Sequence, residues 1–306
     1  MTRIFITGAQ GFIGSHLVHR LKARGLEVAG PEIQLADVAG LAAALTESKP
    51  DWIIHLAGIS SVPACAKDPG LAYTVNAAGT ANLLEAAITA KLPSSRVLFA
   101  STAQVYRAPG STELGADAAP WNESRAVEPQ NTYARTKLAG EAVIRGFGQA
   151  YGTKSTIFRI FNHTHFSQAP DFILPHLYQQ LKAAKDTGKR RVTIPVGNLD
   201  LDRDIGGIHD LLGAFEAVVM RPMASLPEQE LFNVASGSAK RLRTLAEALA
   251  RTMGIEAEFV VDPSRIRAGE PKRICGSSEK LQKATGWKPT CVDVDSLLKS
   301  FLAPVT

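Results

Sequence analysis

Two side chains with clear chemical potential stand four positions apart, Tyr133 and Lys137. If this stretch is helical, they lie on one face, one turn apart. A free phenol has a pKa near ~10 and exchanges protons poorly at pH 7, but a nearby ammonium favours the phenolate and lowers that pKa. Such a pair can give or take a proton near neutrality. The same spacing also occurs on solvated helix surfaces, so it does not by itself show that the pair is catalytic. The residues upstream supply the further evidence.

A hydroxyl comes directly after a strand-like run that precedes this pair. Residues 96–100 are mostly apolar, and Ser101 and Thr102 follow them. Active-site groups of open α/β sheets lie at such strand ends. We therefore expect Thr102, Tyr133 and Lys137 to be catalytic; for Thr102 the alternative is a strand-end cap.

A glycine-rich turn follows the first strand-like run, residues 3–7, and precedes a helical pattern. Strand, glycine loop and helix form the context of a dinucleotide fingerprint, in which backbone N–H groups approach a pyrophosphate at the helix N-terminus. The spacing is GxxGxxG, where the standard fingerprint is GxGxxG. We expect the loop and the first helical residues to bind the cofactor: Gly8, Gly11, Phe12, Ile13 and Gly14.

Further cofactor contacts are expected after the second and third strands. The second, residues 26–30, ends without a clear acid or base for the ribose, so NADP(H) and NAD(H) both stay open. Asp37, followed by Val38, could reach an adenine edge or simply cap a helix. Small residues after the third strand leave room for a cofactor, with Asn76 on the following helix; this set is Leu56, Ala57, Gly58 and Asn76. His55, within the apolar strand, is expected to be packed in the core.

Composition excludes several classes of protein. The chain has 306 residues, 45% of them hydrophobic and 21% charged, and no apolar run approaches the ~20 residues that span a bilayer. A strand-like start leaves no room for a signal peptide. Three distant cysteines without metal-ligand spacing favour a reducing, cytoplasmic location and predict no metal site. The charge of +5 is scattered, which favours an anionic small substrate over nucleic acid.

The order of patterns predicts an α/β protein with a Rossmann-type, doubly wound parallel sheet. We expect residues 1–161 to form the dinucleotide-binding domain and residues 162–306 a smaller α/β substrate-binding part, interleaved with the sheet. Residues 107–130 predict an irregular excursion. In the second part, Asp171 is expected to cap a helix that runs to about Lys185. Further strands are expected at 191–196 and 231–234, and further helices near 208–220, 241–253 and 277–285.

These motifs together resemble the extended short-chain dehydrogenase/reductase family, which includes nucleotide-sugar epimerases, dehydratases and reductases. The resemblance rests on the glycine loop, His55-Leu-Ala-Gly58, Thr102, and the Tyr133–Lys137 pair, and covers nearly the whole chain. It implies that Thr102 hydrogen-bonds the substrate oxygen, Tyr133 passes the proton, and Lys137 lowers the tyrosine pKa while holding the nicotinamide ribose.

The second half resembles the branch of this family that reduces GDP-4-dehydro-6-deoxy-mannose. The resemblance lies in Phe161-Asn-His-Thr164, in 196–204, 262–267 and 280–289. Two segments depart from the branch: 165–167, where it has Gly-Pro-Gly, and 205–207, where an aromatic and an acid are usual. We expect a nucleotide sugar, GDP-linked, held by Gln104, Asn162, Arg203 and Arg267 beside Thr102. Arginine forks match phosphate oxygens, although surface arginines are also common, and His163 and His165 are weaker substrate candidates.

Three activities stay open at this level. Dehydratases of the family carry acids after the catalytic threonine, where this chain has Ala103 and Gln104, so dehydration is not expected. Net reduction of the 4-keto group is favoured, of the kind that yields GDP-D-rhamnose; a 4-epimerase and a non-catalytic NAD(P)-binding sensor are the alternatives. As in the family, we expect a homodimer, paired through the helices at 72–90 and 132–150 by apolar side chains: Leu83, Leu84, Val143, Ile144 and Phe147.

Overall fold

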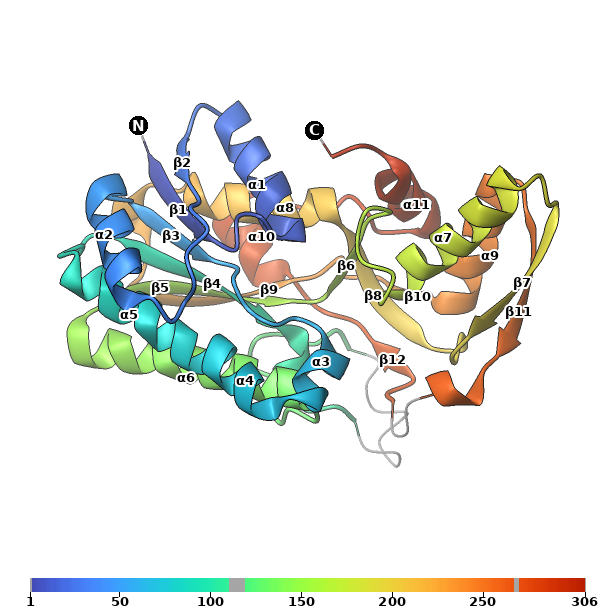
Figure 1. The fold of residues 1–306 in the computed structure, drawn as a ribbon, viewed down its shortest axis with the longest axis horizontal. Helices are drawn as coiled ribbons and strands as arrows, with labels where there is room; N and C mark the ends of the chain where they lie inside the picture. Colours follow the sequence, from blue (N-terminus) through green and yellow to red (C-terminus); the bar gives the residue numbers. More distant parts are fainter. Residues whose placement is uncertain (1, 110–118, 267–269, 306) are drawn as a thin grey trace.

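A parallel sheet forms the body of the protein (Figure 1). The computed structural model describes residues 2–109, 119–266 and 270–305. Six described strands lie in the order β2-β1-β3-β4-β5-β9, with every neighbouring pair parallel. Their bounds are β1 Arg3–Thr7, β2 Glu27–Ala29, β3 Trp52–His55, β4 Arg96–Thr102, β5 Lys154–Ile160 and β9 Gln229–Val234. The order reverses direction between β1 and β3, and ligands of such sheets bind beyond the strand ends at that point.

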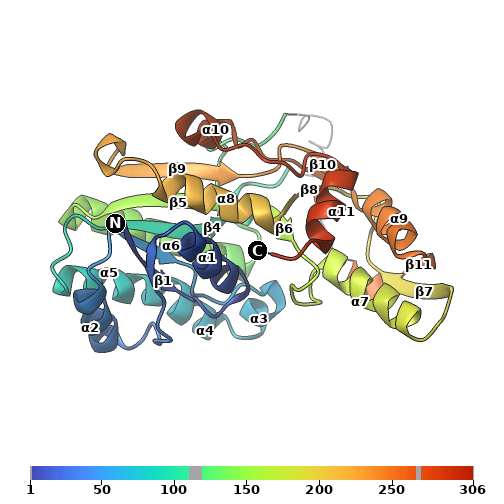
Figure 2. The ribbon, with the colours of Figure 1, turned by 90° about the horizontal axis from the view of Figure 1, so that it is seen from above.

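Helices cover both faces of this sheet, as right-handed crossovers between parallel strands require (Figures 1 and 2). On one face α1 (Phe12–Ala23) and α8 (Ile208–Val219) pack in one apolar cluster with β1, β3, β4, β5 and β9. On the other face α2 (Val38–Ser48), α5 (Gly79–Thr89) and α6 (Thr132–Tyr151) pack in a second cluster. Burial on both faces explains why the strands are almost continuously apolar.

Short helices connect β3 to α5 across the edge where the strands end. They are α3 (Val62–Lys67) and α4 (Pro69–Tyr73), followed by a π-helical turn over Thr74–Ala78. A short 3₁₀ turn, Ala103–Val105, follows β4. The π turn carries Asn76, and such turns are frequent at functional sites.

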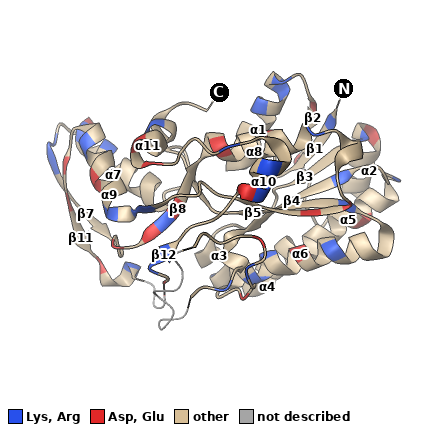
Figure 3. Cartoon of the chain, turned by 180° about the vertical axis from the view of Figure 1, so that it is seen from behind, with Lys and Arg blue, Asp and Glu red and all other residues tan. Residues whose placement is uncertain are grey.

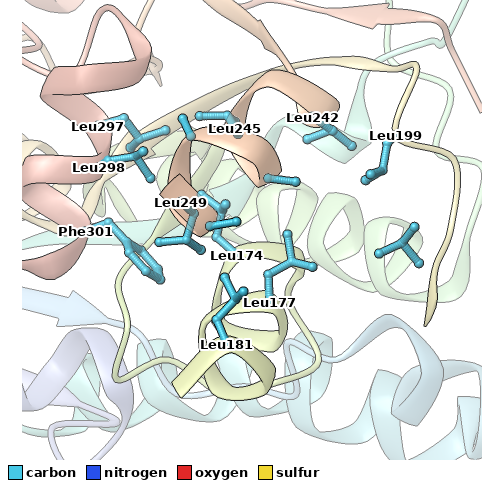
Figure 4. Close-up of a cluster of buried hydrophobic side chains, with 14 of the residues drawn as sticks. Leu174, Leu177, Leu181, Leu199, Leu242, Leu245, Leu249, Leu297, Leu298 and Phe301 are labelled. Carbon is cyan, nitrogen blue, oxygen red and sulfur yellow. The ribbon is translucent and has the colours of Figure 1, made fainter. Parts of the chain in front are cut away.

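The smaller C-terminal part has its own apolar core (Figure 4). Three helices contribute to it: α7 (Ile173–Asp186), α9 (Leu242–Met253) and α11 (Val294–Leu302). A two-stranded parallel sheet lies beside them, β7 (Arg191–Val196) with β11 (Glu256–Val261). A second sheet is centred on β8, and its strands are β6 (Asn162–Thr164), β8 (Asp202–Gly207), β10 (Ala239–Arg241) and β12 (Arg273–Ile274).

The expected fold class is confirmed by this architecture. The chain after residue 161 also returns to the large sheet, because β9 pairs with β5, α8 covers the sheet, and α10 (Glu279–Thr285) contacts β9. The division at residue 161 stays a prediction. The cap expected at Asp171 is wrong: α7 begins after Phe172, whose side chain makes no capping hydrogen bond.

Residues of both charges are interspersed along the helices, strands and loops of the chain (Figure 3). Among the described helices, none is long and apolar enough to cross a membrane.

His55 is packed in the core, as the sequence indicated. Its two ring nitrogens lie 2.7 Å from the Thr7 hydroxyl and 3.1 Å from the Thr80 hydroxyl. Burial, with a smaller contribution from the charge of Lys137, lowers the pKa of His55 from 6.5 to about 3. The folded protein therefore holds this ring neutral at pH values where the unfolded chain binds a proton.

We expect this burial to make the fold acid-sensitive. Below pH 6.5 the unfolded state binds more protons than the folded state, so the free energy of unfolding falls as the pH falls toward 3. Between pH 7.5 and 5.5 the loss from His55 alone is about 1.4 kcal/mol. Urea unfolding at both pH values measures it, and His55→Gln should reduce the pH-dependent difference by about that amount. The exposed His19 supplies the control, His19→Gln; an equal pH dependence in wild type and His55→Gln would refute this account.

Candidate active site

Two cavities meet at the carboxyl ends of the central strands. The first, which we call the glycine-loop cavity, has a volume of about 320 Å³ and lies between the loop after β1 and the ends of β3, β4 and β5. The second, the arginine cavity, has a volume of about 310 Å³ and reaches Arg203 in the smaller part. The two cavities share five of their lining residues: Thr102, Gln104, Ile160, Phe161 and Asn162. A ligand in one cavity can therefore meet a ligand in the other beside Thr102.

The glycine loop has the shape that a pyrophosphate needs. Gly8 has φ +72°, and a Cβ on Gly14 would lie 2.1 Å from the Gly8 carbonyl oxygen, so larger residues do not fit there. Helix α1 begins at Phe12, and its N-cap Gly11 provides no side-chain hydrogen bond. Its first backbone N–H groups have no partner within the helix and are available to an anion. Five predicted cofactor residues line the cavity here: Gly8, Gly11, Phe12, Ile13 and Gly14.

After β3, the predicted residues separate into two groups. Leu56 and Gly58 line the glycine-loop cavity, whereas Asn76 does not. The Asn76 amide instead accepts a hydrogen bond from the Ile59 N–H at 2.7 Å and donates to the Ile59 carbonyl at 3.0 Å. It also donates to the Thr136 hydroxyl at 2.9 Å. Asn76 therefore fixes the loop after β3 to helix α6, and so shapes the cavity without lining it.

Three other predicted cofactor residues also lie outside the lining of this cavity. The exposed Asp37 caps α2 by accepting a hydrogen bond from the Gly40 N–H at 2.8 Å, and Val38 packs against the core under that helix. The Ala57 N–H donates to the Thr7 hydroxyl at 3.3 Å. The structure brings none of them to the cavity, so a cofactor contact at these positions stays a prediction.

Tyr133 and Thr102 come together where the two cavities meet, although 31 positions separate them in the chain. Burial raises the pKa of Tyr133 to about 12, and a hydrogen bond with Thr102 lowers it only in part. The expectation that Lys137 would bring this pKa down toward neutrality is therefore not met in this structure, because loss of water around the phenol has the larger effect. Tyr133 is therefore protonated at neutral pH, and it carries this hydroxyl proton in the lining of the cavity.

Lys137 lies one turn further along α6 and lines the same cavity. It is 6% exposed, and its Nζ lies 4.3 Å from the centre of the Phe99 ring. Burial lowers the pKa of Lys137 to about 8, while Glu141 raises it. At pH 7 the ammonium is therefore still charged, and it supplies a positive field beside Tyr133.

Arg203 is the cation of the arginine cavity. Only 8% of it is exposed, and its guanidinium donates to the Asp202 carbonyl at 3.0 Å and lies 3.9 Å from the Glu270 carboxylate. Burial lowers the pKa of Arg203, while Glu270 and Asp202 raise it. Tyr106 and Trp121 line the same cavity. Arg267, the other predicted phosphate ligand, lies outside the described residues.

Gln104 and Asn162 lie where the sequence analysis expected substrate. Both line both cavities, and the Gln104 side-chain oxygen accepts a hydrogen bond from the Asn131 amide at 2.9 Å. The amide of Asn131 thereby orients Gln104, while Ala103, in the same wall, offers no polar group.

Several lining residues were missed from the sequence. Some lie at predicted strand ends or directly after them, where the strand-end rule could have found them: Ile59, Ser60, Ala100, Ile160 and Phe161. Others, Gln168, Ala169 and Phe172, come from the irregular segment before α7, for which no sequence signal existed. His163 lines the glycine-loop cavity and stacks on Phe12 with ring centres 6.3 Å apart. His165 instead binds the Ala303 carbonyl at 2.8 Å, beside the C-terminal segment.

The fold is a parallel sheet with a glycine loop at its first crossover, and a hydroxyl, a tyrosine and a lysine lie at the ends of its strands. Together these features define the class of the protein as an NAD(P)-dependent oxidoreductase. The chain matches the family described as GDP-mannose 4,6 dehydratase over residues 31–301. It is 33% identical to the GDP-6-deoxy-D-mannose reductase of Pseudomonas aeruginosa, over 96% of this chain and 94% of the relative.

Solved structures agree with this relationship. The structure of RMD from Pseudomonas aeruginosa complexed with NADPH superposes with a TM-score of 0.84 at 30% identity, covering 99% of this chain and 98% of that one. The Thermus thermophilus UDP-glucose 4-epimerase in complex with NAD has a TM-score of 0.79 at 28% identity, covering 98% and 99%. The chain belongs to the NAD-dependent epimerase/dehydratase family of extended short-chain dehydrogenases/reductases. It is an NAD(P)-dependent enzyme that modifies sugar nucleotides.

Substitution of Tyr133 tests the proton donor. Tyr133→Phe removes the hydroxyl but keeps the ring, and we expect turnover to fall by ~10²-fold or more, the usual scale for loss of a general acid. Cofactor binding, measured by quenching of protein fluorescence, should change little. Tyr151→Phe on the exposed end of the same helix is the matched control. Turnover of Tyr133→Phe within threefold of wild type would remove Tyr133 from this role.

Proposed function

We propose that this enzyme reduces the 4-keto group of a nucleotide-linked 6-deoxy sugar, with GDP-4-dehydro-6-deoxy-D-mannose as substrate and GDP-D-rhamnose as product. The observation that carries the proposal is that Thr102, Tyr133 and Lys137 line the glycine-loop cavity, and that Thr102 also lines the arginine cavity. A dinucleotide in the glycine-loop cavity and a sugar nucleotide in the arginine cavity would meet beside the proton donor.

The chain's own residues would act on the keto oxygen. Thr102 and Tyr133 would orient it by hydrogen bonds, and Tyr133 would give its proton to the developing alkoxide. Lys137 would stabilise the negative charge on the phenolate that remains. The reduced dinucleotide, NADPH or NADH, supplies the hydride when bound.

The wall of the arginine cavity argues against dehydration. Removal of water from a sugar needs an acid and a base next to the reacting carbons. Ala103 and Gln104, the two residues that follow Thr102, cannot exchange a proton at neutral pH, and the Gln104 amide is held by Asn131. A keto sugar would therefore have to be the substrate that enters, and a dehydrating enzyme would have to make it.

The smaller part would bind the nucleotide, in keeping with a division near residue 161. A diphosphate carries charge that would complement the buried Arg203 guanidinium, which in this structure has Glu270 at 3.9 Å. A guanidinium fork matches two phosphate oxygens. Asn162, exposed at the junction of the cavities, would contact the pyrophosphate or the sugar.

A 4-epimerase uses the same three catalytic side chains, and a UDP-glucose 4-epimerase is among the similar structures. An epimerase first oxidises the 4-hydroxyl, so its tyrosine must begin as a base. The similarity to a GDP-6-deoxy-D-mannose reductase, 33% identical over 96% of this chain, supports the reductive direction.

The stoichiometry of the cofactor separates the two reactions. We expect the purified protein to oxidise one equivalent of NADPH or NADH per GDP-4-dehydro-6-deoxy-D-mannose consumed, because a reductase releases the oxidised cofactor after each turnover. Absorbance of the reduced cofactor and chromatography of the sugar nucleotide measure both amounts. Interconversion of 4-hydroxy sugar nucleotides without net cofactor consumption would establish the epimerase instead. Binding of cofactor without turnover of either type would favour the sensor.

We further propose a homodimer that pairs α5 and α6 of two subunits. The apolar side chains that suggested it do not support it: Leu83, Leu84 and Ile144 are fully buried within one chain, and Val143 and Phe147 pack against the same core. Other large apolar side chains of these helices are free to contact a partner. Ile88 on α5 is 41% exposed and Tyr151 on α6 is 65% exposed.

Light scattering tests this assembly. We expect a mass of two chains, each of 32.7 kDa, at micromolar concentration. The double change Ile88→Glu/Tyr151→Glu should shift the protein toward one chain, because it places four like charges in a two-fold interface. A wild-type mass of one chain would contradict the proposal, and an unchanged dimer in the variant would place the interface elsewhere.

A further inference from the structure

A buried carboxylate lies beneath the catalytic residues and has no part in the mechanism above. Glu141 is on α6, one turn beyond Lys137, and none of its surface is exposed. It accepts hydrogen bonds from the Ser101 hydroxyl at 2.6 Å and from the Arg159 guanidinium at 2.9 and 2.7 Å. The third partner, Arg145, lies 2.8 Å away and is partly exposed. Burial alone raises the pKa of Glu141, but Arg159, Ser101 and Arg145 outweigh it and hold that pKa below its ordinary value.

These contacts join three elements at the catalytic centre. Ser101 is on β4 and precedes Thr102, while Arg159 is on β5, paired with Ser101 across the sheet. Glu141 is on the helix that carries Tyr133 and Lys137. One carboxylate therefore ties the helix with the proton donor to the strand with its hydrogen-bond partner. A shift of about 1 Å between such groups is enough to slow a reaction strongly.

The same network continues to the arginine cavity. The Arg159 guanidinium lies 4.7 Å from the centre of the Tyr106 ring, and the Tyr106 hydroxyl donates to the Asn233 side chain at 2.6 Å. The Asn233 amide donates to the Trp121 carbonyl at 2.9 Å. Because Tyr106 and Trp121 line the arginine cavity, the charges beneath the catalytic residues also support the surface on which we propose that the sugar nucleotide lies.

Glu141 also acts on the charge of its neighbour. Burial lowers the pKa of Lys137 to about 8, and Glu141 is the largest influence in the opposite direction, followed by the Cys65 thiol of α3. The other titratable groups near Lys137 are His55 of β3, whose own pKa that lysine lowers, and Tyr133 on the same helix. His55 is neutral at pH 7, so Glu141 is the principal negative charge that favours the ammonium.

We propose that Glu141 is a positioning residue of the active site: its carboxylate aligns Thr102 with Tyr133 through Ser101 and Arg159, and it places a negative charge one helical turn from the Lys137 ammonium. The inference rests on the proposed reduction for its kinetic part only. Its electrostatic part concerns the free protein and is independent of any substrate.

Two variants test separately how Glu141 aligns Thr102 with Tyr133 and how its charge affects Lys137. Ser101→Ala removes the tether to β4 and keeps the charge; we expect kcat to fall about tenfold, with KM and the titration of Lys137 unchanged. Glu141→Gln/Arg159→Met removes both buried charges together, so that no unpaired Arg159 is left to unfold the protein. In this double variant kcat should fall by at least the same factor, and the alkaline limb of the kcat profile should move to lower pH.

The titration of Lys137 can be read directly in the protein without ligands. Protein labelled with ¹³C-lysine gives a Cε resonance whose shift follows the charge, and Lys137→Met identifies it. We expect a midpoint near 8 in wild type and a lower midpoint in the double variant. Arg145→Gln is the matched control, because it removes only the outer partner of Glu141; kcat and the lysine midpoint should stay at wild-type values.

The results that would refute this inference differ from the results that would refute the proposed function. A wild-type protein that turns over no keto sugar refutes the proposed reduction, and the lysine titration then decides the present inference by itself. A folded Glu141→Gln/Arg159→Met variant with the wild-type Lys137 midpoint and, where the enzyme is active, kcat within twofold of wild type would overturn it. That result would leave Glu141 and Arg159 with a role in folding alone.

Discussion

Parallel pairing of β4 with β5 is the interaction on which both cavities depend. The register runs from Arg96 opposite Lys154 to Thr102 opposite Ile160, so Thr102 lies beside the point where the chain leaves β5 for Phe161 and Asn162. Charged side chains form hydrogen bonds at both ends of the paired strands β4 and β5. At the start, the buried Arg96 guanidinium donates to the Ser155 carbonyl at 2.8 Å and to the Pro227 carbonyl. At the end, Glu141 holds Ser101 and Arg159. The strand ends are thus fixed where the chemistry needs them fixed.

Helix α6 brings a second constraint, because it places a phenol, an ammonium and a carboxylate in succession on the side that faces the sheet. Burial acts on each group in the direction of its neutral form. Burial raises the pKa of Tyr133, so the phenol stays protonated, and it lowers the pKa of Lys137 only in part. The pKa of Glu141 is held below its ordinary value, because three donors surround the carboxylate. The protonation states of the side chains in the site follow from these three balances.

Local patterns in the sequence predicted much of this arrangement. The glycine loop, the apolar strands and the helix with Tyr133 and Lys137 are defined by short-range spacing, and the fold class and family followed from them. The same reasoning failed where burial by distant segments decides. The side chains expected at a dimer interface are core, because α2 and the sheet cover them. The cofactor contact expected at Asn76 stays a prediction; what the sequence did not show is that its amide is hydrogen-bonded to Ile59 and Thr136. The pKa of Tyr133 is raised where the sequence predicted that it would be lowered, because the spacing of Tyr133 and Lys137 does not show how much water reaches the phenol.

The sequence by itself therefore determined which residues could do chemistry, and their order along the strands and helices, because glycine turns, helical periodicity and strand ends are local properties. Only the tertiary structure decided which of them meet. It brought Thr102 and Tyr133 to one cavity, placed Arg203 in the adjoining cavity, and surrounded Glu141 with Ser101 and Arg159. These contacts link positions that no periodic pattern relates. Their strength depends on the exclusion of water by segments folded over them, which is a property of the whole packed chain.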